Sequence, residues 1–371
     1  MQSRKITLSV FIVLFATSFA FCQSEALKPV VNNLAYYKQK KDLKYLASAK
    51  KSIDSLITTH ADSLDVRKLV YRAVVNSTIV YVDTLNTLKQ PANFFTQTAD
   101  LVDKLIANKR IINFQDQMDY VKRCIANVYI RRGFGYMNTS DFANAELSFL
   151  KAQKYVPYFK PLNFYIAYSS NKLGNLQDAA KYYSYLIDAD STKAEYVEAV
   201  STIYKLTGDT AKALEIIQKG RRLLPNDKLL LLDEANIYNN RKDYGALEPL
   251  LGSLLENYPN NADIAFVAGN CYDNLNQYSK AENYYLQAIE LNGSAYDPVY
   301  NLGLLYFKES LIKPADKQND IARAEQLLEK ANEISPDDIR GLQVLQLVYI
   351  QTQNKNQLIN VNNKLKQLNN Q

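Results

Sequence analysis

Several residue types that enzymes and metal sites depend on are scarce in this sequence. Among 371 residues there are one histidine, three cysteines and no tryptophan. The single histidine, His60, cannot form a histidine cluster for zinc, and it leaves any Ser/His/Asp triad dependent on one apparently exposed residue. A glycine-rich phosphate loop is also lacking, because Gly133 and Gly135 fall inside a helical pattern. We therefore expect no enzyme, no cofactor and no metal site.

Glycine and proline are scarce as well, at 11 and 10 residues, whereas 47% of the residues are hydrophobic. Because both residues interrupt helices, their scarcity is typical of a mostly helical chain with ample apolar surface to bury. Beyond the first 22 residues, no apolar run approaches the roughly 18 residues that a membrane-spanning helix needs. The mature protein is therefore expected to be soluble.

The first 22 residues have the pattern of a signal peptide. Arg4 and Lys5 form its basic start, and an apolar run covers residues 8–16. Cys22 is the small residue expected just before the cleavage site, so the mature chain would begin at Gln23. This leader predicts an exported protein of bacterial type, periplasmic or secreted after cleavage.

A second way of processing the leader would acylate Cys22, as in a lipoprotein. That processing requires a small residue before the cysteine, where this sequence has Phe21. Removal of residues 1–22 takes away two positive charges and no negative ones, so the formal net charge of +6 becomes +4. This modest charge, without a basic cluster among aromatic residues, argues against nucleic acid as a partner.

The pattern that organises the chain begins near residue 126. Its marker residues are Tyr129, Arg132, Gly133, Tyr136, Ala145, Phe149, Ala152 and Pro157. This spacing is typical of two antiparallel helices, in which the small residue of the first helix faces the alanine of the second and proline ends the second helix. It resembles the tetratricopeptide repeat (TPR), which has a period of 34 residues, with Tyr129 and Arg132 replacing the usual Trp and Leu.

The pattern recurs at that period. Successive steps of 34 from Gly133 all reach small residues: Ala167, Ser201, Ala235, Gly269 and Gly303. The same steps from Tyr136 mostly reach tyrosine: Ser170, Tyr204, Tyr238, Tyr272 and Tyr306. Because one repeat cannot cover its own apolar face, repeats stack and bury a continuous core. The resemblance implies an all-α fold, a right-handed superhelical solenoid of TPR helical hairpins.

The repeat register divides the chain into a signal peptide (1–22), a divergent helical N-terminal region (23–125) and a TPR array (126–371). The N-terminal region is expected to form degenerate hairpins or a cap. About seven repeats are expected: 126–159, 160–193, 194–227, 228–261, 262–295, 296–338 and 339–371. The sixth is nine residues longer than its neighbours, and residues 307–320 are expected to form an extended turn there. That turn is either a tolerated insertion or a partner contact.

In proteins that resemble this one, the first helices of successive repeats line a groove that holds a protein or peptide. The candidate groove residues are Phe134, Phe164, Tyr165, Tyr168, Asn171, Asn236, Asn239, Phe266, Asn270 and Tyr300. The charged candidates are Glu195, Glu198, Lys205, Asp233, Asp263 and Asp273. Aromatic and asparagine side chains can hold a segment by apolar contact and by hydrogen bonds to its backbone. Tyr165 and Phe266 could instead pack between repeats.

The resemblance implies a TPR-mediated protein- or peptide-binding adaptor or assembly scaffold in the cell envelope. Two alternatives stay open, a structural spacer that docks larger partners through its ends and a helical envelope hydrolase that uses paired carboxylates. The pairs Asp233-Glu234 and Asp337-Asp338 are expected at helix starts and turns, where a carboxylate favours the helix N-terminus. Cys124 and Cys271 are expected to remain unpaired, since four repeats separate them.

Overall fold

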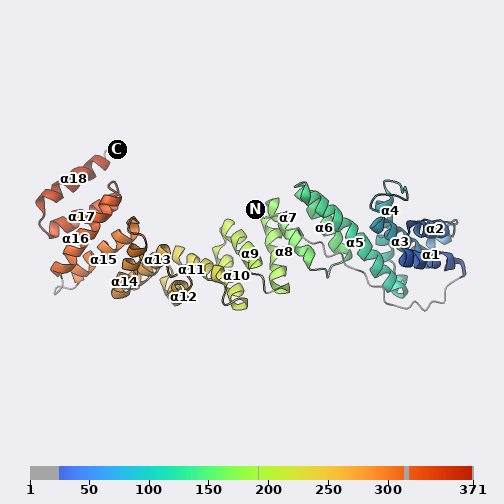
Figure 1. Ribbon diagram of the computed structural model, residues 1–371, viewed down its shortest axis with the longest axis horizontal. Helices are drawn as coiled ribbons and strands as arrows, with labels where there is room; N and C mark the ends of the chain where they lie inside the picture. Colours follow the sequence, from blue (N-terminus) through green and yellow to red (C-terminus); the bar gives the residue numbers. More distant parts are fainter. Residues whose placement is uncertain (1–24, 191, 313–316, 370–371) are drawn as a thin grey trace. The chain divides into compact units, whose positions relative to one another are not determined.

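The computed structural model describes residues 25–190, 192–312 and 317–369, and every regular element in these ranges is a helix (Figure 1). The chain divides into two compact units, Met1–Asn175 and Leu176–Gln371, called here the first and the second unit. The prediction of an all-α fold built from helical hairpins is confirmed. The predicted signal peptide, residues 1–22, lies outside the described residues.

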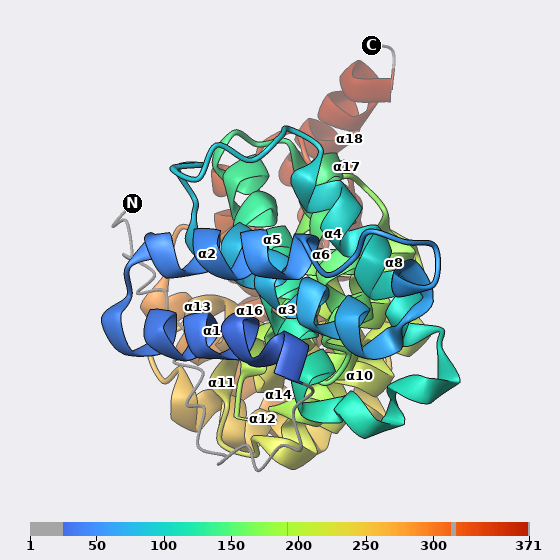
Figure 2. The ribbon, with the colours of Figure 1, turned by 90° about the vertical axis from the view of Figure 1, so that its right-hand side faces the viewer.

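The first unit contains seven α-helices within its described residues. They are α1 (Lys28–Lys40), α2 (Leu43–Asp54), α3 (Val66–Val82), α4 (Phe94–Ile106), α5 (Gln115–Asn138), α6 (Phe142–Tyr155) and α7 (Pro161–Lys172). Short 3-10 turns precede α1, α3 and α5 at Glu25–Leu27, Asp62–Leu64 and Lys109–Phe114. Figure 2 shows α1 and α2 as a hairpin in front of α3, and the three helices share an apolar core that includes Leu46, Ile53 and Val75. The N-terminal region thus begins with one helical hairpin, α1 and α2, packed against α3.

One helix in the first unit is longer than the repeat pattern predicts. The repeat pattern places the start of the first repeat at residue 126, but α5 runs without a break from Gln115 to Asn138, over 24 residues. No proline interrupts it, and Val121, Ile125 and Val128 continue its buried face through the predicted boundary. The first repeat helix is therefore extended at its N-terminal end.

The second unit contains eleven α-helices within its described residues. They are α8 (Leu176–Ala189), α9 (Ala194–Leu206), α10 (Thr210–Leu223), α11 (Lys228–Asn240), α12 (Tyr244–Asn257), α13 (Ala262–Asn274), α14 (Tyr278–Leu291), α15 (Tyr296–Ile312), α16 (Lys317–Ile334), α17 (Ile339–Gln351) and α18 (Lys355–Asn369). From α9 onward, consecutive helices form the predicted hairpins. The boundary between the compact units falls inside the predicted repeat 160–193, so α7 and α8 belong to different units.

A backbone feature repeats with the same period as the side-chain pattern. A residue with positive φ follows the first helix of each hairpin at Ser140, Gly174, Gly208, Lys242 and Asn276, and again at Gln353. In each case the next residue donates its N–H to a carbonyl five positions earlier, as in Asp209 to Tyr204 and Asp243 to Tyr238. This closure satisfies carbonyls that the helix end leaves unpaired. The hairpins are therefore alike in their turns as well as in their packing.

The small residue of each first helix meets a bulky residue of the second helix. A Cβ added to Gly133 would lie 2.6 Å from the ring of Phe149, and one added to Gly303 would lie 2.8 Å from Leu328. Both distances are shorter than any real contact, so glycine is required for the helices to approach so closely. The closest side chain to each glycine is therefore not the expected alanine but the aromatic residue or leucine one turn after it, Phe149 after Ala145 and Leu328 after Ala324.

The nine additional residues of the sixth repeat mainly lengthen its helices, so the predicted extended turn over residues 307–320 is wrong for the described part. Helices α15 and α16 contain 17 and 18 residues, whereas the other helices from α8 to α14 contain 13 or 14. Ser310 occupies the position at which other repeats have the positive-φ residue, but here it is helical and buried. Its Oγ donates to the carbonyl of Phe307 at 2.7 Å. Residues 313–316, which include Pro314, lie outside the described residues.

Candidate functional site

The ten predicted groove residues divide equally between the two units. The first unit carries Phe134, Phe164, Tyr165, Tyr168 and Asn171, and the second carries Asn236, Asn239, Phe266, Asn270 and Tyr300. None of the ten is fully buried, and Asn171 and Asn236 are exposed. Each unit therefore has its own surface of first helices, and each surface is described separately.

The aromatic candidates of the first unit form one connected cluster on α5, α6 and α7. The ring of Tyr165 lies 4.7 Å from that of Phe134 and 5.3 Å from that of the fully buried Phe149. Tyr165 and Phe134 thus pack against the interior, where aromatic pairs at such distances stabilise the fold. Phe164 and Tyr168 stack at 6.3 Å on the outer side of this cluster, and both remain partly exposed.

Asn270 is a structural hub in the second unit. Its Oδ1 accepts hydrogen bonds from the hydroxyl of Tyr285 at 2.8 Å and from Nδ2 of Asn301 at 2.8 Å. These bonds connect α13 to α14 and α15. Phe266 packs 6.1 Å from the ring of Tyr285, and burial raises the pKa of that tyrosine. Asn270 and Phe266 were predicted to line the groove. In the structure they also hold the helices together.

Tyr300 lies on α15, next to the last hairpin. Its ring stacks on that of Tyr296 at 5.5 Å, and the guanidinium of Arg340 on α17 lies 5.8 Å from it. The side chain is partly buried against the core formed by α14 to α18. Tyr300 is therefore only partly exposed, and the cation beside its ring is Arg340.

Ion pairs connect the first helices of neighbouring hairpins. On α9 and α11, Lys205 Nζ lies 3.0 Å from Asp233 Oδ2. On α13 and α15, Asp273 Oδ2 lies 3.0 Å from Lys308 Nζ, and only 10% of the Asp273 side chain is exposed. Sequence reasoning missed Lys308, although the thirteenth position of a repeat lies beside the groove positions and could have identified it.

The carboxylate pair Asp233-Glu234 was expected at a helix start or turn, and this is wrong because both residues lie inside α11. Glu234 is buried and pairs with Arg221 of α10, while Gln218 Nε2 donates to its Oε1 at 3.3 Å. A carboxylate engaged in this way is a structural partner and cannot easily exchange protons with a substrate. Asp338 does cap a helix, accepting from the N–H groups of Arg340 and Gly341.

The surface of α11 has the most available polar side chains among the predicted residues. Within the described parts of the chain, no group hydrogen-bonds to the side-chain amide of Asn236 or Asn239. Leu229, the second residue of the same helix, is 58% exposed. Glu198 faces this helix from α9, and burial, followed by the negative charges of Asp227 and Asp233, raises its pKa.

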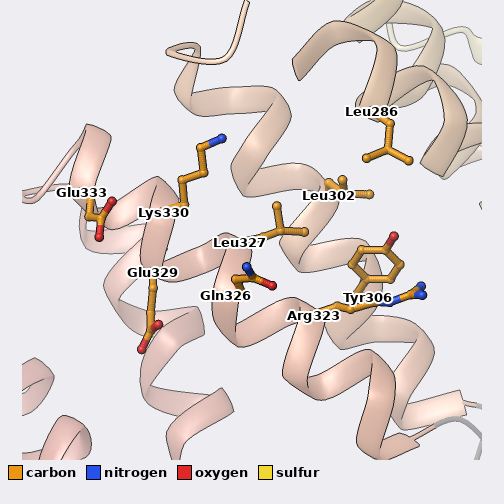
Figure 3. Close-up of a pocket in the computed structure, with 9 residues that line it drawn as sticks. All are labelled: Leu286, Leu302, Tyr306, Arg323, Gln326, Leu327, Glu329, Lys330 and Glu333. Atoms are coloured by element: carbon orange, nitrogen blue, oxygen red, sulfur yellow. The ribbon is translucent and has the colours of Figure 1, made fainter. Parts of the chain in front are cut away.

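A separate hollow of about 540 Å³ is lined by residues of α14, α15 and α16 (Figure 3). It is lined by Leu286, Leu302, Tyr306, Arg323, Gln326, Leu327, Glu329, Lys330 and Glu333. The Tyr306 hydroxyl donates to Glu282 Oε1 at 2.5 Å, and the Arg323 guanidinium lies 5.3 Å from the Tyr306 ring. Leu286, Leu302 and Leu327 form the apolar part of its lining. Charged side chains of both signs, Arg323, Lys330, Glu329 and Glu333, complete it.

Within residues 25–190, 192–312 and 317–369, no three His, Cys, Asp or Glu side chains are placed to hold a metal ion. None of the helices in these ranges is long and apolar enough to cross a membrane. His60 is exposed, as expected from its position in the sequence. Cys124 and Cys271 are free, buried thiols.

A family model described as tetratricopeptide repeat matches residues 262–294, which cover α13 and α14. No curated protein sequence matches the chain. The structure of YrrB, described as a TPR protein with an unusual peptide-binding site, is 19% identical with a TM-score of 0.44, over 53% of this chain and 96% of that one. MamA from Desulfovibrio magneticus RS-1 is 17% identical with a TM-score of 0.37, over 47% and 96%. MamA AMB-1 is 20% identical with a TM-score of 0.38, over 47% and 98%. Values this low support no conclusion about ligands.

Proposed function

Because this chain is a tetratricopeptide-repeat protein, we propose that it acts as a non-enzymatic scaffold that binds a protein or peptide segment along its first helices. A repeat scaffold offers an extended surface with few chemical groups of its own, and its specificity comes from the side chains placed on that surface. Such a protein needs no cofactor. The proposed partner is a protein or peptide rather than nucleic acid.

The observation that carries the proposal is the contrast between α11 and its neighbours. The Lys205–Asp233 pair and the hydrogen bonds of Asn270 hold the flanking first helices in place. Between them, Asn236 and Asn239 have side-chain amides without a protein partner in the described ranges. An amide offers both donors and acceptors, so two of them can pair with the backbone of an extended segment. Flanking helices that are held in place, with free asparagine amides between them, are more typical of a binding surface than of a purely structural one.

The test uses a phage-displayed peptide library selected on the immobilised full-length chain. Asn236→Ala combined with Asn239→Ala should weaken binding of the selected peptides by roughly thirtyfold, because each of the two lost hydrogen bonds contributes about 1 kcal/mol. Gln326→Ala, on α16 in the hollow of Figure 3, is the matched control and should leave binding unchanged. Equal binding by all three proteins would reject the α11 surface.

A spacer that works only through its ends would give a different result. Deletion of the last hairpin, α17 and α18, would then matter more for partner capture than any change on α11. Phe164→Ala with Tyr168→Ala tests the first unit by itself, since these stacked rings are partly exposed. Each unit is tested with its own variant, because the candidate residues of the two units belong to different compact bodies.

We also propose that the protein acts outside the cytoplasm, in the periplasm or after secretion. The support is the sequence of residues 1–22, with its basic start and apolar run. Fusion of residues 1–30 to alkaline phosphatase, which is active only after export, tests this in a bacterial host. Arg4→Glu with Lys5→Glu should reduce the exported activity, and a fusion that is inactive from the outset would refute export. Mass measurement of the mature chain separates cleavage before Gln23 from acylation of Cys22.

A further inference from the structure

The first helical hairpin, α1 and α2, is strongly basic. Residues 28–54 contain seven lysines against two aspartates, with no arginine or glutamate, which gives a formal charge of +5. Six of the seven lysines are exposed. The hairpin also contains Tyr36, Tyr37 and Tyr45. The expectation that the chain has no basic cluster among aromatic residues is therefore wrong for this hairpin, because the modest net charge of the whole chain conceals it.

The hairpin buries one face and leaves the opposite face exposed. On α2, Leu46 and Ile53 are fully buried in the core shared with α3. Lys44, Ser48 and Lys51 follow one another at spacings of four and three residues, so they lie on one side of the helix, and all three are exposed. Figure 2 shows α1 and α2 side by side in front of α3. The exposed side is therefore an open surface two helices wide.

An aromatic side chain lies among the lysines of this surface. Tyr36 and Lys40 are four residues apart on α1, so they share a side of that helix. The ring of Tyr36 lies 5.5 Å from that of Tyr45 on α2, so the exposed rows of the two helices adjoin. Tyr36 is 51% exposed. We call the surface formed by Tyr36, Lys40, Lys44 and Lys51 the basic face.

Ion pairs leave most of the charge of the basic face uncompensated. Lys44 Nζ lies 3.0 Å from Asp42 Oδ2, and both side chains are exposed, so solvent screens this pair. Within the described ranges, the side chains of Lys40 and Lys51 form no ion pair and no hydrogen bond. Two free ammonium groups are therefore available to an anionic partner.

We propose that the basic face binds the headgroups of anionic phospholipids at a membrane surface. This inference rests on the proposed action outside the cytoplasm, and it adds the surface to which the scaffold attaches. Clusters of about four to eight Lys or Arg are typical of anionic-lipid binding, because each cation is attracted to the charged headgroups. Tyrosine is enriched at membrane–water interfaces, where its ring is apolar and its hydroxyl stays wet. The attachment is peripheral, with lysines at the phosphates and Tyr36 among the headgroups.

The form of the basic face favours a membrane over a nucleic acid. A membrane presents phosphate groups over a broad plane, which suits lysines spread over two helices that lie side by side (Figure 2). Nucleic acids are commonly held by arginine forks or by a groove that follows the phosphate backbone, whereas residues 28–54 contain no arginine. The proposed export also favours phospholipids, because they are the anionic surface that an exported protein meets.

A purely structural explanation of the basic face makes a different prediction. The terminal hairpin of a repeat array needs a polar outer face for solubility, because no further repeat covers it. On this explanation the lysines interact with water alone, and the chain does not distinguish anionic from neutral vesicles. A preference for one type of lipid therefore separates the two explanations.

The experiment measures co-sedimentation of the chain with vesicles of phosphatidylcholine, alone or mixed with phosphatidylglycerol. It uses residues 23–371, which contain every described element, because the apolar run of the leader would itself enter a bilayer. Lys40→Gln combined with Lys51→Gln removes the two free charges of the basic face. The matched control is Lys109→Gln combined with Lys160→Gln, which removes two exposed lysines elsewhere in the first unit.

The wild-type chain should sediment with phosphatidylglycerol vesicles and not with pure phosphatidylcholine, and added salt should weaken the binding. The substitutions on the basic face should weaken it by roughly thirtyfold, because each lysine near an anionic surface contributes about fivefold. The control should leave binding almost unchanged at physiological salt, where charges beyond about 8 Å are screened. Circular dichroism identifies any variant that has lost its helices.

Position 36 provides an independent measurement, because the sequence contains no tryptophan. Tyr36→Trp introduces a single indole, and its fluorescence emission should shift to shorter wavelength when anionic vesicles are added, since the ring then leaves bulk water. Tyr158→Trp is the control. Tyr158 is 94% exposed between α6 and α7, away from the basic face, and emission from this position should not shift.

Three results would refute the membrane-binding face: equal binding to both types of vesicle, an equal loss in the two double variants, or an unshifted emission at position 36. Tighter binding of an oligonucleotide or an acidic peptide than of the anionic vesicles, lost on substitution of Lys40 and Lys51, would overturn the choice of partner. The export fusion ends at residue 30 and the peptide selection concerns α11. Failure of the membrane face would therefore leave the scaffold function and the proposed export intact.

Discussion

The ring of Tyr285 occupies the space that a side chain on Gly269 would need. A Cβ at position 269 would lie 2.5 Å from the Tyr285 ring, although Tyr285 is fully buried and its hydroxyl is fixed by Asn270. The ring cannot retreat, so Gly269→Ala should destabilise the protein by about 1–3 kcal/mol despite the better helix propensity of alanine. Urea unfolding followed by circular dichroism measures this loss.

Gly252 supplies the control for that substitution. It is exposed in the interior of α12 with open space where a Cβ would be, so Gly252→Ala should gain about 0.5–1 kcal/mol from helix propensity alone. The two variants should shift the unfolding midpoint in opposite directions. A shift in the same direction would show that position 269 does not require glycine because of its close packing against Tyr285.

The turns at positive φ give a second prediction, which concerns backbone conformation only. Gly208 has φ of +79° and no atom within 4 Å of an added Cβ, so Gly208→Ala should cost about 1 kcal/mol through left-handed strain. Lys242 occupies the equivalent turn at φ of +56°. Lys242→Gly should therefore stabilise the protein, by about 0.5 kcal/mol, because relief of strain exceeds the added entropy of the unfolded chain.

Thermal unfolding of both variants checks the prediction, since the two shifts should have opposite signs. The exposed Lys330 on α16 is a suitable control for loss of a lysine side chain in general, and Lys330→Ala should change the melting temperature little. A stabilising Gly208→Ala would contradict the left-handed turn at that position.

Asn270 and Asn236 were predicted from the same repeat position, but the structure gives them different environments. Loss of the Asn270 side chain leaves the buried Tyr285 hydroxyl without its acceptor, so Asn270→Ala should cost about 1–3 kcal/mol. Asn236 is exposed, and Asn236→Ala should stay within about 0.5 kcal/mol of the wild type. Chemical denaturation distinguishes them, and equal stabilities would mean that the hydrogen-bond hub contributes nothing.

The difference between these two asparagines explains what the sequence could predict. Spacing determines which helix face a residue occupies, so the hairpins and the positions of the small residues followed from the period of 34. Spacing does not determine whether a partner is within reach across the next helix. Asn301 and Tyr285 are 31 and 15 residues from Asn270, and only the folded chain brings both to its oxygen.

The sixth repeat shows a related limit. Its additional residues were interpreted as a loop because Pro314 and several polar residues lie among them. Helicity around Phe307 and Ser310 instead depends on burial against neighbouring helices, which overrides local preference.

The carboxyl group of Glu198 gives a prediction about pH. Burial and the nearby carboxylates Asp227 and Asp233 raise its pKa above the ordinary value of 4.5. A carboxyl with a raised pKa in the folded state binds its proton more tightly there than in the unfolded chain. The wild type is therefore penalised at pH values above the folded pKa, and the penalty disappears as the pH falls below the unfolded value.

Glu198→Gln should accordingly raise the melting temperature at pH 7, and the gain over the wild type should shrink toward zero near pH 4. Differential scanning calorimetry at several pH values measures the difference between the two proteins directly. Glu290→Gln, at an exposed position on α14, is the control and should show no comparable dependence. If the gain in melting temperature of Glu198→Gln stayed constant from pH 7 to pH 4, the glutamine would act through packing. The charges of Asp227 and Asp233 would then not explain the stabilisation.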